Sequence, residues 1–136
     1  MILKIFTDGG SKGNPGISSI GGVGYINGKK VFEFKKSIGI ATNNDAEYQA
    51  LIEALRNIKN QILNIKNTGQ ISKIEFNSDS RLMVNQVRGL FKIKNGRIKE
   101  YILIIRGLEQ EINLPITYSY VPREQNKEAD LLVNSV

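Results

Sequence analysis

Acidic side chains in this sequence stand at the ends of predicted strands and helices, where catalytic groups often gather. The chain has only four aspartates: Asp8, Asp45, Asp79 and Asp130. Asp8 lies where the apolar run MILKIF meets the glycine-rich stretch TDGGSKGNPG at residues 7–16, a pattern typical of a strand ending in a tight loop. Asp79 follows another predicted strand, and Asp130 lies in the first turns of the last predicted helix.

Glu47 is a further candidate, because helical periodicity places it on an apolar face. The stripe from Asn44 onward contains Leu51, Ala54, Leu55, Ile58 and Ile62. Counting back four residues from Leu51 puts Glu47 on the core-facing side of the first turn, where an acid is costly to bury unless something binds it. A capping box between Asn44 and Glu47 explains this acid equally well. Asp79 could likewise serve only to cap the helix that follows it.

The composition narrows the available chemistry. The sequence has 136 residues with no cysteine and no histidine, which excludes disulfides, serine triads that use histidine, and most zinc sites. The remaining tools are carboxylates, hydroxyls, lysine and oxygen-liganded ions such as Mg²⁺ or Mn²⁺. No apolar run approaches the ~20 residues of a membrane span, and the first residues lack the pattern of a signal peptide. We therefore expect a soluble, cytoplasmic protein with a single domain.

Positive charge is concentrated in one part of the chain. Between Arg81 and Arg106 there is a single acid, Glu100, whereas the net charge of the whole chain is +6. The basic residues of this segment are Arg81, Arg88, Lys92, Lys94, Arg97, Lys99 and Arg106. Localised positive charge predicts a polyanionic partner, with a solvated surface or a solubility device as the alternative.

The predicted elements follow the order βββαβααβα. Strands are expected at 1–8, 19–26, 30–38, 71–80 and 116–121, and helices from 44, over 80–88, from about 97 and from about 126. The first strand is apolar on both faces, as in a central, covered strand. Asn27 and Gly28 predict a hairpin between the second and third strands, and Gly21, Gly22 and Gly24 indicate either close approach by a backbone or ligand or a bulge. This order predicts an α/β domain with a mixed sheet and helices on both faces.

The predicted topology can bring four acids together. The carboxyl ends of parallel central strands meet at one sheet edge, which would make Asp8 and Asp79 neighbours, with Glu47 and Asp130 arriving from adjoining helices. Carboxylates that close repel one another unless divalent cations neutralise them. Two such ions are the arrangement that carries phosphoryl hydrolysis, and the basic surface then suggests a nuclease.

Four segments of the chain resemble the motifs of type 1 ribonuclease H, in order and over nearly its whole length. They are TDGGSKGNPG, TNNDAEYQALIEAL, NSDSRLMVNQV and VPREQNKEADLLVN. The resemblance implies a five-stranded sheet of order 3-2-1-4-5 with the second strand antiparallel. It also implies an endoribonuclease that hydrolyses the RNA strand of RNA/DNA hybrids and leaves 5′-phosphate and 3′-hydroxyl ends.

The resemblance also implies roles for individual residues. Asp8 would bind both of two Mg²⁺ or Mn²⁺ ions, Asp130 would complete the site that activates water, and Glu47 and Asp79 would hold the ion near the leaving 3′ oxygen. The positions expected to contact the hybrid are Asn14, Asn43 and Asn44 in the minor groove and Thr42 at a phosphate of the DNA strand. Turn and N-cap roles remain open for these four residues as well.

The sequence departs from the better-known ribonuclease H pattern near its end and in its basic segment. Arg123 stands where a histidine is usual, so we expect a catalytic role in phosphate binding rather than proton transfer. The usual basic protrusion is missing, and Lys92, Lys94 and Arg97 are the expected substrate contacts in its place. Compact, histidine-less forms from archaea and some bacteria are the most similar. We expect a monomer, with double-stranded RNA as a second candidate substrate; a catalytically weak binding module and a junction resolvase are the alternatives.

Overall fold

The structure is a computed structural model that describes residues 1–61 and 71–136. Its strands are β1 (Ile2–Lys12), β2 (Gly16–Ile26), β3 (Lys29–Ala41), β4 (Lys73–Ser78) and β5 (Ile116–Tyr120). Its helices are α1 (Asn43–Asn60), α3 (Arg81–Val87), α4 (Gly96–Ile112) and α5 (Lys127–Asn134), with a 3₁₀ turn at Arg123–Gln125. The predicted order of elements is confirmed, while Ile62, predicted to extend the stripe of α1, lies outside the described residues.

The five strands form one mixed sheet in the order β3-β2-β1-β4-β5, which confirms the predicted order. β2 runs antiparallel to both of its neighbours, whereas β1, β4 and β5 are parallel. Thr7 pairs with Ser78 at the end of the parallel register between β1 and β4. Asp8, within β1, and Asp79, directly after β4, therefore lie at the same level of the sheet on neighbouring strands.

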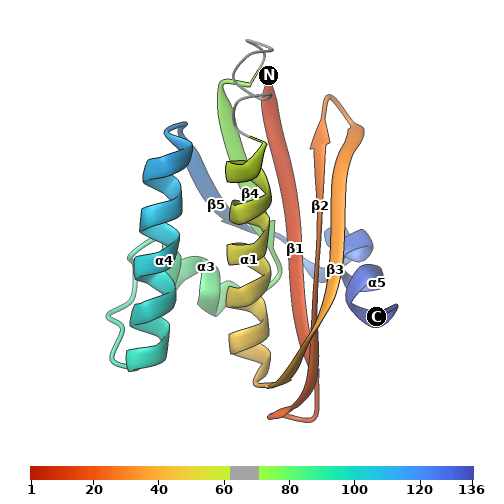
Figure 1. The fold of residues 1–136 in the computed structure, drawn as a ribbon, viewed down its shortest axis with the longest axis vertical. Helices are drawn as coiled ribbons and strands as arrows, with labels where there is room; N and C mark the ends of the chain where they lie inside the picture. The colour runs from red at the N-terminus through yellow and green to blue at the C-terminus, as the bar shows by residue number, and fades with distance from the viewer. Residues whose placement is uncertain (62–70) are drawn as a thin grey trace.

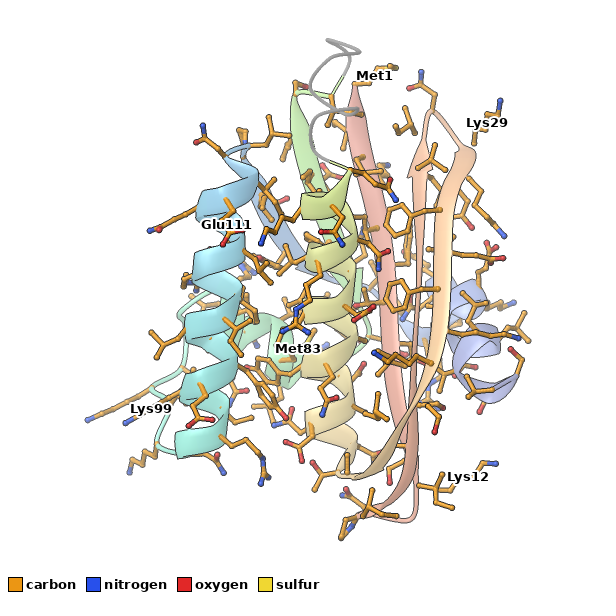
Figure 2. All side chains as sticks on the ribbon, in the orientation of Figure 1. Met1, Lys12, Lys29, Met83, Lys99 and Glu111 are labelled. Atoms are coloured by element: carbon orange, nitrogen blue, oxygen red, sulfur yellow. The ribbon has the colours of Figure 1, made fainter. Side chains whose placement is uncertain are left out.

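Helices α1, α3 and α4 cover one face of the sheet and α5 covers part of the other (Figure 1). The main core lies between the sheet and the three helices, where Leu3, Ile5, Leu55 and Ile105 are almost fully buried. Figure 2 shows Met83 of α3 between α1 and α4, where it closes this core. Burial of these apolar side chains is the main force that holds α1 against the sheet.

β1 is central, as predicted, but only one of its faces is covered along the full length of the strand. Leu3 and Ile5 face the core, whereas Ile2 is 38% exposed and Lys4 is also exposed on the opposite face. The prediction of two covered faces is thus wrong for this half of β1, because α5 has only eight residues and packs beside Gly10 and Gly21 instead.

Several predicted ends and caps need correction. β1 extends to Lys12, because Gly9–Lys12 pair with Ile17–Ile20 of β2. The capping box of α1 is formed by Thr42 and Asp45, so the predicted box between Asn44 and Glu47 is wrong. Ser80 caps α3 by accepting from Met83 N, so this role is not needed from Asp79. The helical spacing of Ala129, Leu132, Val133 and Val136 predicts that all four point inward. Val136 is instead 52% exposed, because α5 ends at Asn134.

Candidate active site

Three carboxylates converge where the parallel pairing of β1 with β4 ends. Asp8, Glu47 and Asp79 each offer an oxygen atom, and these atoms lie within 4.8 Å of one another. Asp8 comes from β1, Asp79 directly follows β4, and Glu47 comes from the first turn of α1. Asp8 and Glu47 are each only 8% exposed, which is unusual for acids that have no cation beside them.

The position of Glu47 is set by direct contact between the backbones of α1 and β1. A Cβ atom on Gly9 would lie 2.3 Å from the carbonyl carbon of Ala46, so only glycine allows α1 to approach this closely. Gly9 N then donates a 2.8 Å hydrogen bond to Glu47 Oε1. The glycine-rich segment therefore both admits the helix and orients its carboxylate.

Asp130 is positioned by the docking of α5 on the other face of the sheet. A Cβ atom on Gly21 would lie 2.8 Å from Leu132 Cβ and 3.1 Å from Ala129 O, so Gly21 confirms the predicted close approach by a backbone. Ser19 Oγ donates to Val133 O at 2.8 Å. The buried Asn126 Nδ2 donates to Thr7 O at 2.9 Å, which ties the start of α5 to the residue before Asp8.

The four predicted acids line one cavity of about 470 Å³. Asp130 interacts with the carboxyl group of Asp8 but lies outside the tight group of Asp8, Glu47 and Asp79. The cavity is also lined by the predicted residues Asn43, Asn44 and Arg123 and by Lys12, Ile17, Ser80 and Asn134. The structure therefore brings together the residues on which the sequence prediction mainly depended.

Burial and mutual repulsion make this cluster costly in its ionised form. Burial, followed by the charges of Asp79 and Asp130, raises the pKa of Asp8 to about 7. Burial and the charges of Asp8 and Asp79 also raise the pKa of Glu47 well above its usual value. A set of buried oxygen donors that repel one another fits hard divalent cations such as Mg²⁺ or Mn²⁺. Asp8, Glu47, Asp79 and Asp130 are the residues that would hold them.

Arg123 lies at the rim of the cavity in the 3₁₀ turn before α5. Its Nε atom is 3.7 Å from Asp79 Oδ2, and its side chain is 85% exposed. The alternative to a phosphate contact is an exposed loop arginine paired with Glu124 or Glu128, but Glu128 forms an ion pair with Lys30. The guanidinium therefore lies beside the carboxylate of Asp79 while most of the side chain is exposed to solvent.

The predicted substrate-binding residues are arranged in two groups. In the first group, Asn43 N donates to Asn14 Oδ1 at 3.0 Å and Ser11 N donates to Asn43 Oδ1 at 2.9 Å. These bonds join the tip of the β1–β2 hairpin to the start of α1, where Figure 2 shows the nearby Lys12. Asn14 and Asn43 are exposed, so both are accessible to a ligand that lies across the cavity.

The second group lies near the start of α4. Lys92 and Lys94 are exposed in the segment that joins α3 to α4, whereas Arg97 is engaged within the protein. Arg97 Nε donates to Asp45 Oδ1 at 2.8 Å, and Thr42 Oγ1 donates to Asp45 Oδ2 at 2.8 Å. Asp45, which joins these two predicted contacts, is not among the predicted site residues. The spacing of Thr42 and Asp45 matches a capping box, a signal for their mutual contact but not for the contact with Arg97.

Comparison with known proteins agrees with this geometry. The family described as reverse transcriptase-like matches residues 6–136. LC11-RNase H1 was isolated from compost by a metagenomic approach and solved in complex with an RNA/DNA hybrid. It is 37% identical to this chain, with a TM-score of 0.89, and the match covers 98% of this chain and 95% of that chain. Ribonuclease HI of Halobacterium salinarum is 33% identical over 133 residues. The chain belongs to the type 1 ribonuclease H family.

Relatives of this ribonuclease H differ in length. The match to the halobacterial enzyme spans 97% of this chain and 62% of that protein. The N-terminal RNase H domain of Rv2228c from Mycobacterium tuberculosis gives a TM-score of 0.85 at 32% identity, covering 100% of this chain and 98% of that domain. The chain covers 35% of full-length Rv2228c. The similarity therefore concerns the ribonuclease H domain.

Proposed function

We propose that this ribonuclease H is an endoribonuclease that hydrolyses the RNA strand of RNA/DNA hybrids with two divalent ions and leaves 5′-phosphate and 3′-hydroxyl ends. The main support is the convergence of Asp8, Glu47 and Asp79 within 4.8 Å in a cavity that Asp130 also lines. Bound Mg²⁺ or Mn²⁺ would supply Lewis acidity, activating water and stabilising charge on the phosphate and the leaving oxygen.

The roles proposed for the four acids are those that the family resemblance implies, and their arrangement supports them. The charges of Asp79 and Asp130 act on the carboxyl group of Asp8, so Asp8 would help to hold both ions. Asp130, which lies outside the tight group, would serve the ion on the side of the attacking water. Glu47, oriented by Gly9 N, and Asp79 would hold the ion on the side of the leaving 3′ oxygen.

The remaining residues would position the nucleic acid. Arg123 has charged donors beside Asp79 and could hold the scissile or departing phosphate with two parallel hydrogen bonds. Asn14, Asn43 and Asn44 would contact the minor groove, Thr42 a phosphate of the DNA strand, and Lys92, Lys94 and Arg97 the backbone farther along. Because one chain supplies all these groups, we propose that a monomer is sufficient for activity. We also propose that it acts in the cytoplasm.

No helix within residues 1–61 and 71–136 is long and apolar enough to cross a membrane.

The decisive test of the proposed activity is cleavage of labelled substrates: an RNA/DNA hybrid, double-stranded RNA, duplex DNA and a four-way junction. Each substrate is incubated with Mg²⁺, Mn²⁺ or EDTA. Cleavage of the hybrid that requires a metal ion, with mapped 5′-phosphate ends, would support the proposal. Cleavage of only the junction, or hybrid cleavage in EDTA, would contradict it.

A further inference from the structure

An exposed apolar surface adjoins the carboxylate cavity and has no role in the site described above. Ile17 of β2 and Ile40 of β3 are 63% and 71% exposed. They are direct partners in the antiparallel register of the two strands, so their side chains lie next to each other on the same face of the sheet. We call this pair the isoleucine ledge.

A β-bulge places Ile40 on the ledge. Ile38 is opposed by no residue of β2, because Ser18 pairs with Gly39 and Ser19 pairs with Ser37. Gly39 has a φ of +79°, a conformation that favours glycine. Without the extra residue, Ile40 would continue the series of Phe34, Lys36 and Ile38 toward α1, since side chains alternate along a strand. The bulge instead turns Ile40 to the side of Ile17.

The ledge is continuous with the cavity that holds the four acids. Ile17 lines that cavity together with Lys12, its neighbour across the β1–β2 hairpin. Ile17 therefore shares the cavity lining with Asn43 and Asn44, and Ile40, its partner across the two strands, extends this apolar surface away from the cavity. A duplex bound over the carboxylates would reach the ledge along this side.

The chemistry of the ledge distinguishes the two strands of a hybrid. A ribose presents a 2′-hydroxyl that loses hydration against an apolar surface unless it finds a hydrogen-bond partner. A deoxyribose presents a methylene group at the same position and packs against isoleucine without that cost. We propose that Ile17 and Ile40 pack against sugars of the DNA strand and determine specificity for hybrids over double-stranded RNA. This inference rests on the proposed function.

The test combines changes in the protein with changes in the substrate. A series of hybrids carries a single ribonucleotide at successive positions of the DNA strand, opposite a defined RNA strand. The wild-type protein should lose about five- to tenfold in kcat/KM when the ribonucleotide lies at the one or two positions above the ledge. The double variant Ile17→Thr, Ile40→Thr keeps β-branched side chains and supplies hydroxyl groups. It should cleave the all-DNA hybrid several-fold less well and show less than a twofold loss at those positions.

Controls distinguish failure of the ledge from failure of the fold or of the proposed function. Val31, 47% exposed on the same strand β3, gives the matched control Val31→Thr, which should retain the wild-type position profile. Ile17→Val, Ile40→Val should also retain it, and melting curves report folding. The same series measured as binding to Asp8→Asn protein separates contact from chemistry. An identical position profile for wild-type and Thr-variant proteins would overturn the proposal, whereas absence of hybrid cleavage by wild-type protein would overturn the proposed function.

Discussion

Replacement of Asp8 by asparagine should stabilise the metal-free protein at neutral pH while removing its activity. Asp8 is 8% exposed, and burial together with Asp79 and Asp130 raises the pKa of its carboxyl group from 3.8 to about 7. Each pKa unit corresponds to about 1.4 kcal/mol, so the ionised group costs up to roughly 4 kcal/mol. Because neighbouring acids share this repulsion, we expect a gain of about 2 kcal/mol or more in the free energy of unfolding.

The sign of the pH dependence follows from proton binding. Between about pH 4 and pH 7 the folded state retains a proton on Asp8 that the unfolded state loses, so the stability of the wild-type protein falls as pH rises through this range. The gain from Asp8→Asn should therefore be small near pH 4 and reach its full size above pH 7. In a domain of this size, the gain corresponds to roughly 5 to 10 °C in Tm.

The measurement is thermal unfolding in EDTA at pH 4, 6 and 8, followed by cleavage of a hybrid with Mg²⁺. Asp45→Asn is the matched control, because Asp45 is 6% exposed, close to the 8% of Asp8, but has hydrogen-bond donors around its carboxylate. Although burial raises the pKa of Asp45, hydrogen bonds from Thr42 and Arg97 leave it below its usual value. This substitution should therefore destabilise the protein above pH 4 and have progressively less effect as pH falls below that.

Two results would refute this reasoning. An Asp8→Asn protein that melts at or below the wild-type temperature in EDTA at pH 8 would show that the cluster is not under electrostatic strain. Retention of more than about a hundredth of wild-type cleavage would contradict the assignment of Asp8 to both ions, since loss of such a group costs several kcal/mol of transition-state stabilisation.

Three further predictions concern the rim, the basic segment and the docking of α5. Arg123→Ala should lower steady-state cleavage roughly ten- to a hundredfold, as expected for loss of a charge-assisted contact. The Tm should change little because the side chain is exposed. A loss of activity below twofold would exclude a phosphate contact. Replacing Lys92 and Lys94 by alanine should flatten the slope of log affinity against log salt by up to ~0.9 per phosphate contact, and an unchanged slope would place the binding face elsewhere. Gly21→Ala should displace α5 and reduce cleavage at least tenfold, since the added Cβ atom would lie 2.8 Å from Leu132 Cβ. A Cβ atom added at Gly107 would have no neighbour within 4 Å, so Gly107→Ala is a control that should keep full activity.

The parts of this site that the sequence predicts are those that depend on strand direction and helical periodicity. Asp8 and Asp79 could be paired because parallel strands end at one edge of a sheet. The spacing of Glu47 to Leu51 places Glu47 on the core-facing side of its helix, although it leaves a capping role open. Strand direction and helical periodicity can both be read from a single sequence.

The parts that the sequence does not predict depend on contacts between distant side chains. The ion pair of Arg97 with Asp45 joins residues 52 positions apart, and nothing in either segment indicates it. The bulge at Gly39 likewise depends on the register of β3 against β2. Shifting one residue reverses the face of every later side chain, so the isoleucine ledge became visible only with the sheet assembled.

The way in which the acids are held explains how a repulsive cluster can remain assembled before ions bind. Repulsion among Asp8, Glu47, Asp79 and Asp130 acts to separate the elements that carry them. Helix α1 is held by packing on Gly9 and α5 by packing on Gly21. Strand β4 pairs with β1, and Asn126 adds a buried hydrogen bond to Thr7 O. Such contacts allow little adjustment, so the carboxylates cannot relax apart and instead respond by raised pKa values at Asp8 and Glu47. The same rigidity leaves the oxygen donors arranged for cations, which means that ion binding needs little rearrangement of the chain.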